Sequence, residues 1–198
     1  CAKYFELKAL SSYCTALGEY GDGKEDNQGQ CKSCPKGRYG ETTGLIPSSA
    51  CTGCEEGKFG TTAGATSAAI TCTGTCSEGK YGWPTGLSVC KNCAAGRWSS
   101  AAPIGGIGLT SSSQCIGCTP GRWSAGTGKS TNTCQDCSAG RYEPNVGNSA
   151  NSQCDVCASG RFGPTTGATD ASQCTGECSP GRFESGKGKS SNDQCLGR

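Results

Sequence analysis

Large apolar residues of this chain recur at a fixed place within a repeating, mostly polar pattern. Eight times a cysteine pair, spaced C-x2-C or C-x3-C, is followed by two residues, a glycine, a basic residue and an aromatic residue. A second glycine usually stands in the polar stretch that follows, and glycine is favoured where a chain reversal needs positive φ. Each repeat of about 20 residues therefore predicts a short strand that carries the aromatic residue, a glycine turn, and a polar return strand into the next cysteine pair.

The eight aromatic residues form one ladder through the repeats, which we call the aromatic ladder. Its members are Tyr39, Phe59, Tyr81, Trp98, Trp123, Tyr142, Phe162 and Phe183. Because the chain has few aliphatic residues, we expect each ring to pack on a disulfide and on the next repeat. Trp83 lies outside this register, which makes it the aromatic residue to consider for an interface.

A basic residue precedes each ring, and we call this set the basic ladder. Its members are Arg38, Lys58, Lys80, Arg97, Arg122, Arg141, Arg161 and Arg182. Adjacent side chains of a strand point to opposite faces, so each base points outward if its aromatic neighbour packs inward. The ladder then either covers the backbone carbonyls of the neighbouring repeat or pairs with Glu and Asp of the loops, or it contacts an acidic polysaccharide or an acidic partner chain.

Composition excludes an ordinary hydrophobic core. Val, Ile, Leu and Phe together supply only about a tenth of the 198 residues, whereas 19 residues are Cys. This cysteine content is typical of a disulfide scaffold, and such scaffolds form in oxidising compartments. We therefore expect a secreted protein that is extracellular or lies at the cell surface.

The ends of the array indicate how the cysteines pair. Cys14 has no cysteine three residues before it, where Ser11 stands. Cys195 has no cysteine three residues after it, where Arg198 stands. Both missing cysteines would lack a partner if the second cysteine of each pair bonds the first cysteine of the following pair. This sequential scheme leaves Cys1 over, as a candidate for an intermolecular bond. It predicts bonds of Cys14 with Cys31, Cys34 with Cys51, Cys54 with Cys72, Cys76 with Cys90, Cys93 with Cys115, Cys118 with Cys134, Cys137 with Cys154, Cys157 with Cys174, and Cys178 with Cys195. In an alternative scheme neighbouring pairs interlock, first with first and second with second, and this requires repeats in twos.

The pattern divides the chain into an N-terminal segment and an array. Residues 1–13 precede the repeats and are rich in large apolar residues and helix formers, so we expect them to cap the first repeat or to dock on a neighbouring subunit. A degenerate first repeat occupies residues 14–33, eight tandem repeats occupy residues 34–195, and residues 196–198 form a tail. We predict a small disulfide-rich fold, mostly β and irregular. It is an elongated, solenoid-like array of disulfide-stapled β-hairpins with no single hydrophobic core.

The repeated motif resembles a known module. The C-x2-C-x2-G-x-aromatic pattern, as at Cys31, Cys34, Gly37 and Tyr39, is similar to the ephrin-receptor-like cysteine-rich repeat, related in style to EGF-like and tumour-necrosis-factor-receptor repeats. The resemblance covers about residues 14–195. It implies small β-hairpin modules and an extracellular structural or recognition role rather than a catalytic one. Chains that consist almost entirely of such repeats are similar to surface-coat, adhesin and appendage proteins of protists and algae.

No set of residues points to catalysis or to a cofactor. The chain has no His, the commonest general acid or base and the commonest metal ligand. The C-x2-C spacing also occurs in zinc ribbons, but a zinc site uses two pairs, whereas one pair is the repeating unit here. The acidic residues of loop 22–29 suggest calcium, but Lys24 and Asn27 break the calcium-loop pattern at the third and sixth positions. We therefore expect no enzyme, no metal and no cofactor.

Several partner classes are also disfavoured. The chain has no apolar run long enough to span a membrane, and its net charge of +2 does not favour nucleic acid. Many Ser and Thr residues suggest O-linked glycans, whereas the N-linked sequon occurs only in its rare form at Asn132. The sequence favours a non-enzymatic extracellular structural protein that self-associates into a homo-oligomer, filament, appendage or coat. The alternative is a receptor or adhesin ectodomain that binds a protein or an acidic glycan.

Overall fold

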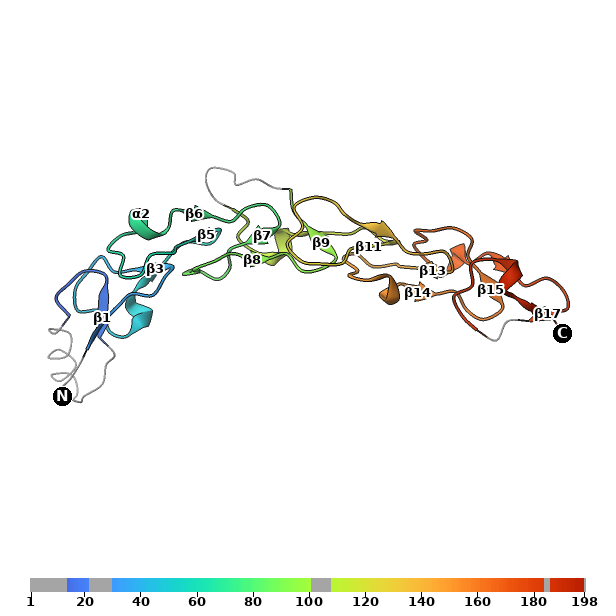
Figure 1. The fold of residues 1–198 in the computed structure, drawn as a ribbon, viewed down its shortest axis with the longest axis horizontal. Helices are drawn as coiled ribbons and strands as arrows, with labels where there is room; N and C mark the ends of the chain where they lie inside the picture. Colours follow the sequence, from blue (N-terminus) through green and yellow to red (C-terminus); the bar gives the residue numbers. More distant parts are fainter. Residues whose placement is uncertain (1–13, 22–29, 101–107, 184–185, 198) are drawn as a thin grey trace. The chain divides into compact units, whose positions relative to one another are not determined.

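The computed structural model describes residues 14–21, 30–100, 108–183 and 186–197. Over these residues the chain forms a series of two-stranded antiparallel hairpins. It divides into two compact units, one of residues 1–91 with 101–112 and one of residues 92–100 with 113–198. Within each unit the hairpins follow one another in chain order (Figure 1).

The first unit carries four hairpins. They are β1 (Glu19–Gly21) with β2 (Cys31–Ser33), β3 (Arg38–Tyr39) with β4 (Thr52–Gly53), β5 (Lys58–Phe59) with β6 (Gly74–Thr75), and β7 (Lys80–Tyr81) with β8 (Lys91–Asn92), whose last residue begins the second unit. The second unit carries five. They are β9 (Arg97–Trp98) with β10 (Ile116–Gly117), β11 (Arg122–Trp123) with β12 (Gln135–Asp136), β13 (Arg141–Tyr142) with β14 (Asp155–Val156), β15 (Arg161–Phe162) with β16 (Gly176–Glu177), and β17 (Arg182–Phe183) with β18 (Leu196–Gly197).

The return strand lies later in each repeat than the sequence pattern predicts. The first strand carries the basic and aromatic residues as expected, but the second strand is made of the residues inside the next cysteine pair, as in Arg141 opposite Val156. In six of the described repeats the polar arm before the closing cysteine instead forms a helical turn. These turns are η1 (Ser48–Ala50), α2 (Ala68–Thr71), η2 (Ser112–Gln114), η3 (Asn151–Gln153), η4 (Ala171–Gln173) and η5 (Asn192–Gln194).

A glutamine side chain holds several of these turns, which explains why Gln often precedes the closing cysteine. The Oε1 atom of Gln153 accepts hydrogen bonds from the backbone N–H and the hydroxyl of Ser149, at 3.1 and 2.8 Å. In η4, Gln173 takes part in a capping box with Asp170. The hydroxyl and backbone N–H of Ser172 also bond to Asp170, and they lower the pKa of its exposed carboxyl group.

Disulfides take the place of a hydrophobic core. The nine bonds of the structure are those of the sequential scheme, with Cα–Cα distances from 5.3 to 6.2 Å and sequence separations from 14 to 22. The buried apolar positions of the described residues are cysteines together with Ala65 and Ala168. Each repeat is therefore closed around its own disulfide, as expected for a chain with so little aliphatic side chain.

Candidate functional site

The surfaces between successive repeats are built from backbone. The repeats closed by Cys118–Cys134 and Cys137–Cys154 illustrate the arrangement. Four backbone hydrogen bonds of 2.8 to 3.0 Å join them: Gly121 N to Glu143 O, Cys137 N to Gly121 O, Ser124 N to Asn148 O, and Gly147 N to Cys118 O. The same four recur at other junctions, for example between the repeats that begin at Cys14 and Cys34. Because the bonds involve only backbone groups, junctions of the same geometry tolerate different side chains.

Several of the glycines before the basic residues reach the repeat after the next one. Gly140 has φ of +82°, and a Cβ atom there would lie within 3.0 Å of the backbone of Gly188, two repeats further on. Gly121 stands in the same relation to Gly167. Glycine is therefore required both by positive φ and by the close approach of another backbone. Three consecutive repeats interlock at each such contact.

The basic ladder turns back onto its own repeats. The side chains of Arg38, Arg97, Arg122 and Arg141 are half-buried, and so are those of Lys58 and Lys80. The Nη1 atoms of four arginines donate to the carbonyl of the cysteine that closes the same repeat: Arg38 to Cys51 at 2.9 Å, Arg97 to Cys115 at 2.9 Å, Arg141 to Cys154 at 2.8 Å, and Arg182 to Cys195 at 3.5 Å.

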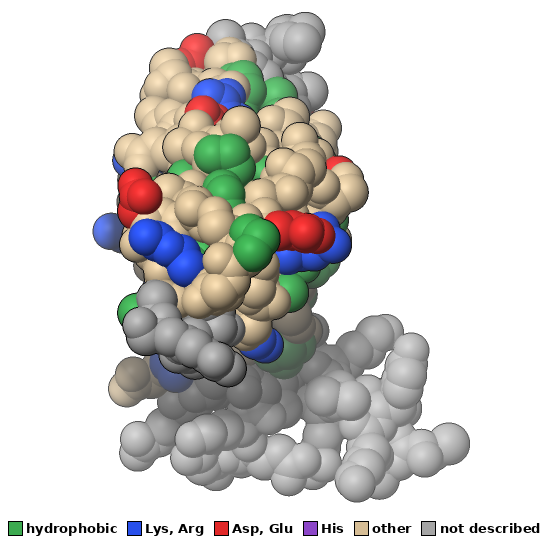
Figure 2. Space-filling view, turned by 90° about the vertical axis from the view of Figure 1, so that its right-hand side faces the viewer, with side chains coloured by type: hydrophobic (Ala, Val, Ile, Leu, Met, Phe, Trp, Pro, Cys, Tyr) green, Lys and Arg blue, Asp and Glu red, His purple; other side chains and the backbone are tan. Residues whose placement is uncertain are grey.

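Other members of the ladder pair with acids. Arg122 Nε bonds to Asp136 Oδ1 at 2.8 Å, and Arg161 Nη2 lies 3.4 Å from Glu177 Oε1. In both pairs the two residues stand directly opposite each other in a hairpin. Lys58 Nζ lies 3.9 Å from Glu55 Oε2. On the face that Figure 2 shows, basic and acidic side chains are interspersed.

The bonds of the ladder predict a difference between two substitutions. Arg141→Met should lower the stability of its repeat by about 1 to 2 kcal/mol, because the Cys154 carbonyl loses its donor. Arg161→Met should change stability by less than about 0.5 kcal/mol, because its partner Glu177 is exposed. Amide hydrogen exchange of the affected repeat measures both values. Equal protection in the two variants would contradict a structural role for Arg141.

The aromatic ladder is half-buried where the structure describes its side chains, from Tyr39 to Phe162. Two of its rings lie on glycines of the opposite strand. A Cβ atom on Gly74 would meet the ring of Phe59, and one on Gly176 would meet the ring of Phe162. Both glycines belong to C-x3-C linkers, so in these two repeats the longer linker contains a glycine that makes room for the ring. Phe183 lies on β17.

Trp83 departs from this pattern in the structure as it does in the sequence. Its side chain is 53% exposed, and Lys91 Nζ lies 5.6 Å from the centroid of its ring. An ammonium group at this distance attracts the face of an indole ring. Val89, two residues before the strand that carries Lys91, is also exposed.

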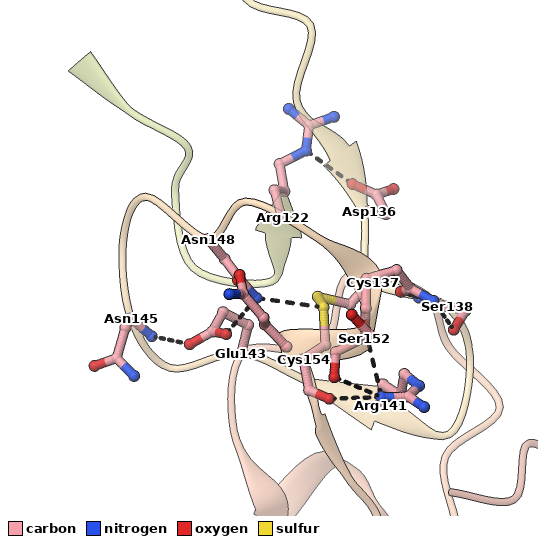
Figure 3. Close-up of a disulfide and its surroundings, with 12 residues drawn as sticks. Arg122, Asp136, Cys137, Ser138, Arg141, Glu143, Asn145, Asn148, Ser152 and Cys154 are labelled. Atoms are coloured by element: carbon pink, nitrogen blue, oxygen red, sulfur yellow. Dashed lines mark hydrogen bonds and ion pairs between the residues drawn. A yellow bond between two sulfur atoms is a disulfide. The ribbon is translucent and has the colours of Figure 1, made fainter. Parts of the chain in front are cut away.

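Glu143 is a buried acid that the repeat pattern did not single out. It follows the aromatic residue, at a position that is Gly or Ser in most other repeats. Its side chain is buried beside the Cys137–Cys154 disulfide (Figure 3). Oε1 accepts from Asn145 N at 2.8 Å, and Oε2 accepts from Asn148 Nδ2 at 2.5 Å. Both carboxylate oxygens therefore have donors, as a buried acid requires. The sequence signal for this site is an acid at a position that is Gly or Ser in most other repeats, with Asn two and five residues later.

Three further predictions concern sites outside the ladders. Cys1 and the acidic loop 22–29 lie outside the described residues. Asn132 is exposed, and its Oδ1 atom accepts from Cys134 N at 3.1 Å. Within the described ranges, no group of three or more Cys, His, Asp or Glu side chains could hold a metal ion. No helix found there has the length and apolar character to cross a membrane.

Part of the chain matches a known protein family. Residues 125–174 match the model of a family described as tyrosine-protein kinase ephrin type A/B receptor-like. No curated protein matches the chain. The matched segment contains the complete repeats Cys137–Cys154 and Cys157–Cys174, and the same closure recurs in series from Cys14 to Cys195. The chain is therefore an array of tandem cysteine-rich repeats, of which residues 125–174 are ephrin-receptor-like.

Proposed function

We propose that this protein is a non-enzymatic structural component of an extracellular surface, which builds a filament, appendage or coat by self-association. The observation that carries the proposal is the internal use of the basic ladder. Its arginines bond to carbonyls or acids of their own repeats. These bonds hold the side chains against their own repeats, which suits a chain whose basic residues serve the array itself.

The disulfides and the junctions support the same role. Nine disulfides favour an oxidising compartment, and secretion to the cell exterior is the setting that we propose. Because the junctions use backbone hydrogen bonds, repeats of many different sequences can be added to the array if they keep the cysteines and glycines. An extended array suits a building block, and O-linked glycans on its many Ser and Thr residues would keep it soluble.

Deletion of residues 1–13 tests self-association. We propose that this segment docks on a neighbouring subunit and that Cys1 bonds another chain. The shortened protein should then remain folded but sediment as a monomer at concentrations where the full chain associates. Cys1→Ser alone should remove only the covalent link seen on a non-reducing gel. If the deletion unfolds the first repeat while association persists, the segment is a cap and the interface lies elsewhere.

The alternative function is a receptor or adhesin ectodomain. It is supported by Trp83, which is exposed and lies outside the register of the aromatic ladder. Aromatic side chains with one exposed face are common in recognition surfaces. This function separates from the first in the same experiment, because an ectodomain that binds a protein or an acidic glycan does not require association of the full chain with itself. Electron microscopy of the native material would show directly whether filaments form.

A further inference from the structure

The sequential disulfides give the chain a second, shorter covalent route. Starting at Cys14, the route crosses the disulfide to Cys31, follows two residues to Cys34, and crosses the next disulfide to Cys51. It continues in this way to Cys195. We call this route the load path; it consists of the nine disulfides and the residues between the two cysteines of each pair. The long loop of every repeat, between its opening and closing cysteines, lies off the path.

The chain segments of the load path are already extended. The residues inside the cysteine pairs are the second strands of the hairpins, such as β4 (Thr52–Gly53), β12 (Gln135–Asp136) and β14 (Asp155–Val156). A β-strand is close to the maximum length that a chain of its residues can span. Pulling on such segments therefore gains little length.

Backbone hydrogen bonds also hold the cysteines of the path. Cys137 N donates to Gly121 O at 2.8 Å, and Cys137 O accepts from Gly167 N at 2.9 Å. These bonds tie one cysteine to both the preceding and the following repeat. If tension breaks these hydrogen bonds, the disulfides still prevent the repeat loops from being extended.

From this topology we infer that the protein is an inextensible, tension-bearing tether, whose length is locked by its disulfides. At about 3.5 Å for each residue of extended chain, the load path from Cys14 to Cys195 reaches at most about 140 Å, against about 630 Å after reduction of all nine disulfides. The function applies to a filament subunit and to an ectodomain alike. If the proposed self-association failed, the tether inference would therefore still hold. If the tether inference failed, the proposed self-association would still hold.

Single-molecule force spectroscopy tests the inference on the full chain held between terminal handles. In the oxidised protein, extension should show no release of a repeat loop. With dithiothreitol present under constant force, each disulfide is reduced to two thiols while dithiothreitol becomes its cyclic disulfide. Each reduction should then release one loop, in steps of about 40 to 70 Å of contour length for separations of 14 to 22 residues. Release of loops from the oxidised protein would overturn the inference.

Paired substitutions locate the path. Cys137→Ser with Cys154→Ser should add a single release of about 50 Å without reductant, because the loop then carries the load. Cys93→Ser with Cys115→Ser is the matched variant and should add about 70 Å, since its loop is the longest. Identical traces for both variants and the unmodified protein would show that force does not follow the disulfides. If a variant repeat fails to fold, its loop length adds to the starting contour and still distinguishes the two variants.

Discussion

Full reduction of the disulfides is expected to unfold every repeat of this protein. Among the described residues the buried apolar positions are cysteines and two alanines, so little other apolar surface remains to hold a reduced repeat. Closing a loop of about 15 residues contributes about 3 kcal/mol in the chain-entropy model. The loops here are of that size, and whole domains are stable by only about 5 to 15 kcal/mol. Loss of nine such contributions therefore exceeds any stability that the hairpins have.

Amide hydrogen exchange measures this outcome. The junction amides, among them those of Gly57, Gly121 and Gly147, should be protected in the oxidised protein and exchange freely after reduction and alkylation. Oxidised protein treated with the alkylating agent alone is the control. Protection that survives complete reduction would show that the junctions hold the fold without the disulfides.

Peptide mapping without reduction tests the pairing on which this expectation rests. It should recover Cys137 linked to Cys154 and Cys157 linked to Cys174. A link between Cys134 and Cys154 would contradict the sequential scheme.

The fold class could be predicted from the sequence because its causes are local. A cysteine pair, a glycine and an aromatic residue at fixed spacing define one hairpin, and their recurrence defines a series of them. The pairing of the cysteines followed from the two ends, where Ser11 and Arg198 replace the cysteines that would have no partner. The structure has the same nine bonds, and the fold is confirmed as small, disulfide-rich and built of short hairpins.

The directions of the basic side chains could not be predicted in the same way. Strand alternation predicts from which face of the strand a side chain leaves, but an arginine side chain is long enough to turn back toward its own repeat. Arg38 leaves its strand and donates to the carbonyl of Cys51 at the other end of its own repeat. That carbonyl becomes an acceptor within reach only when the disulfide has closed the loop. The bond therefore depends on tertiary geometry that the strand pattern does not contain.

Contacts between repeats two apart were also beyond the sequence. The glycines before the basic residues look alike in every repeat, and positive φ alone accounts for them. The structure adds a second requirement at Gly37, Gly96, Gly121 and Gly140, where another backbone fills the space that a side chain would need. Around Gly160 there is no described atom within 4 Å of that space. The repeat of Gly140 is followed by two further repeats and that of Gly160 by one, so within this sequence Gly160 has no repeat two further on to meet.

This difference makes Gly140→Ala and Gly160→Ala a matched pair. Both glycines have positive φ, at +82° and +81°, so both substitutions should lose about 1 to 2 kcal/mol to backbone strain. Gly140→Ala also forces its Cβ atom against the backbone of Gly188, which should cost about 1 to 3 kcal/mol more. The repeat that holds Gly140 and the repeat two further on must then separate or shift.

The exchange rate of one amide, that of Gly188, distinguishes the two variants. In Gly140→Ala, exchange of the Gly188 amide, which donates to Cys157 O at 2.9 Å, should accelerate about tenfold or more, although the substitution lies two repeats away. In Gly160→Ala the same amide should accelerate less, because its acceptor Cys157 O lies in the substituted repeat but no Cβ atom presses on the backbone of Gly188. Equal acceleration at Gly188 in both variants would mean that strain at the glycine itself spreads along the array. In that case the close approach of Gly140 to Gly188 would not be what interlocks the repeats.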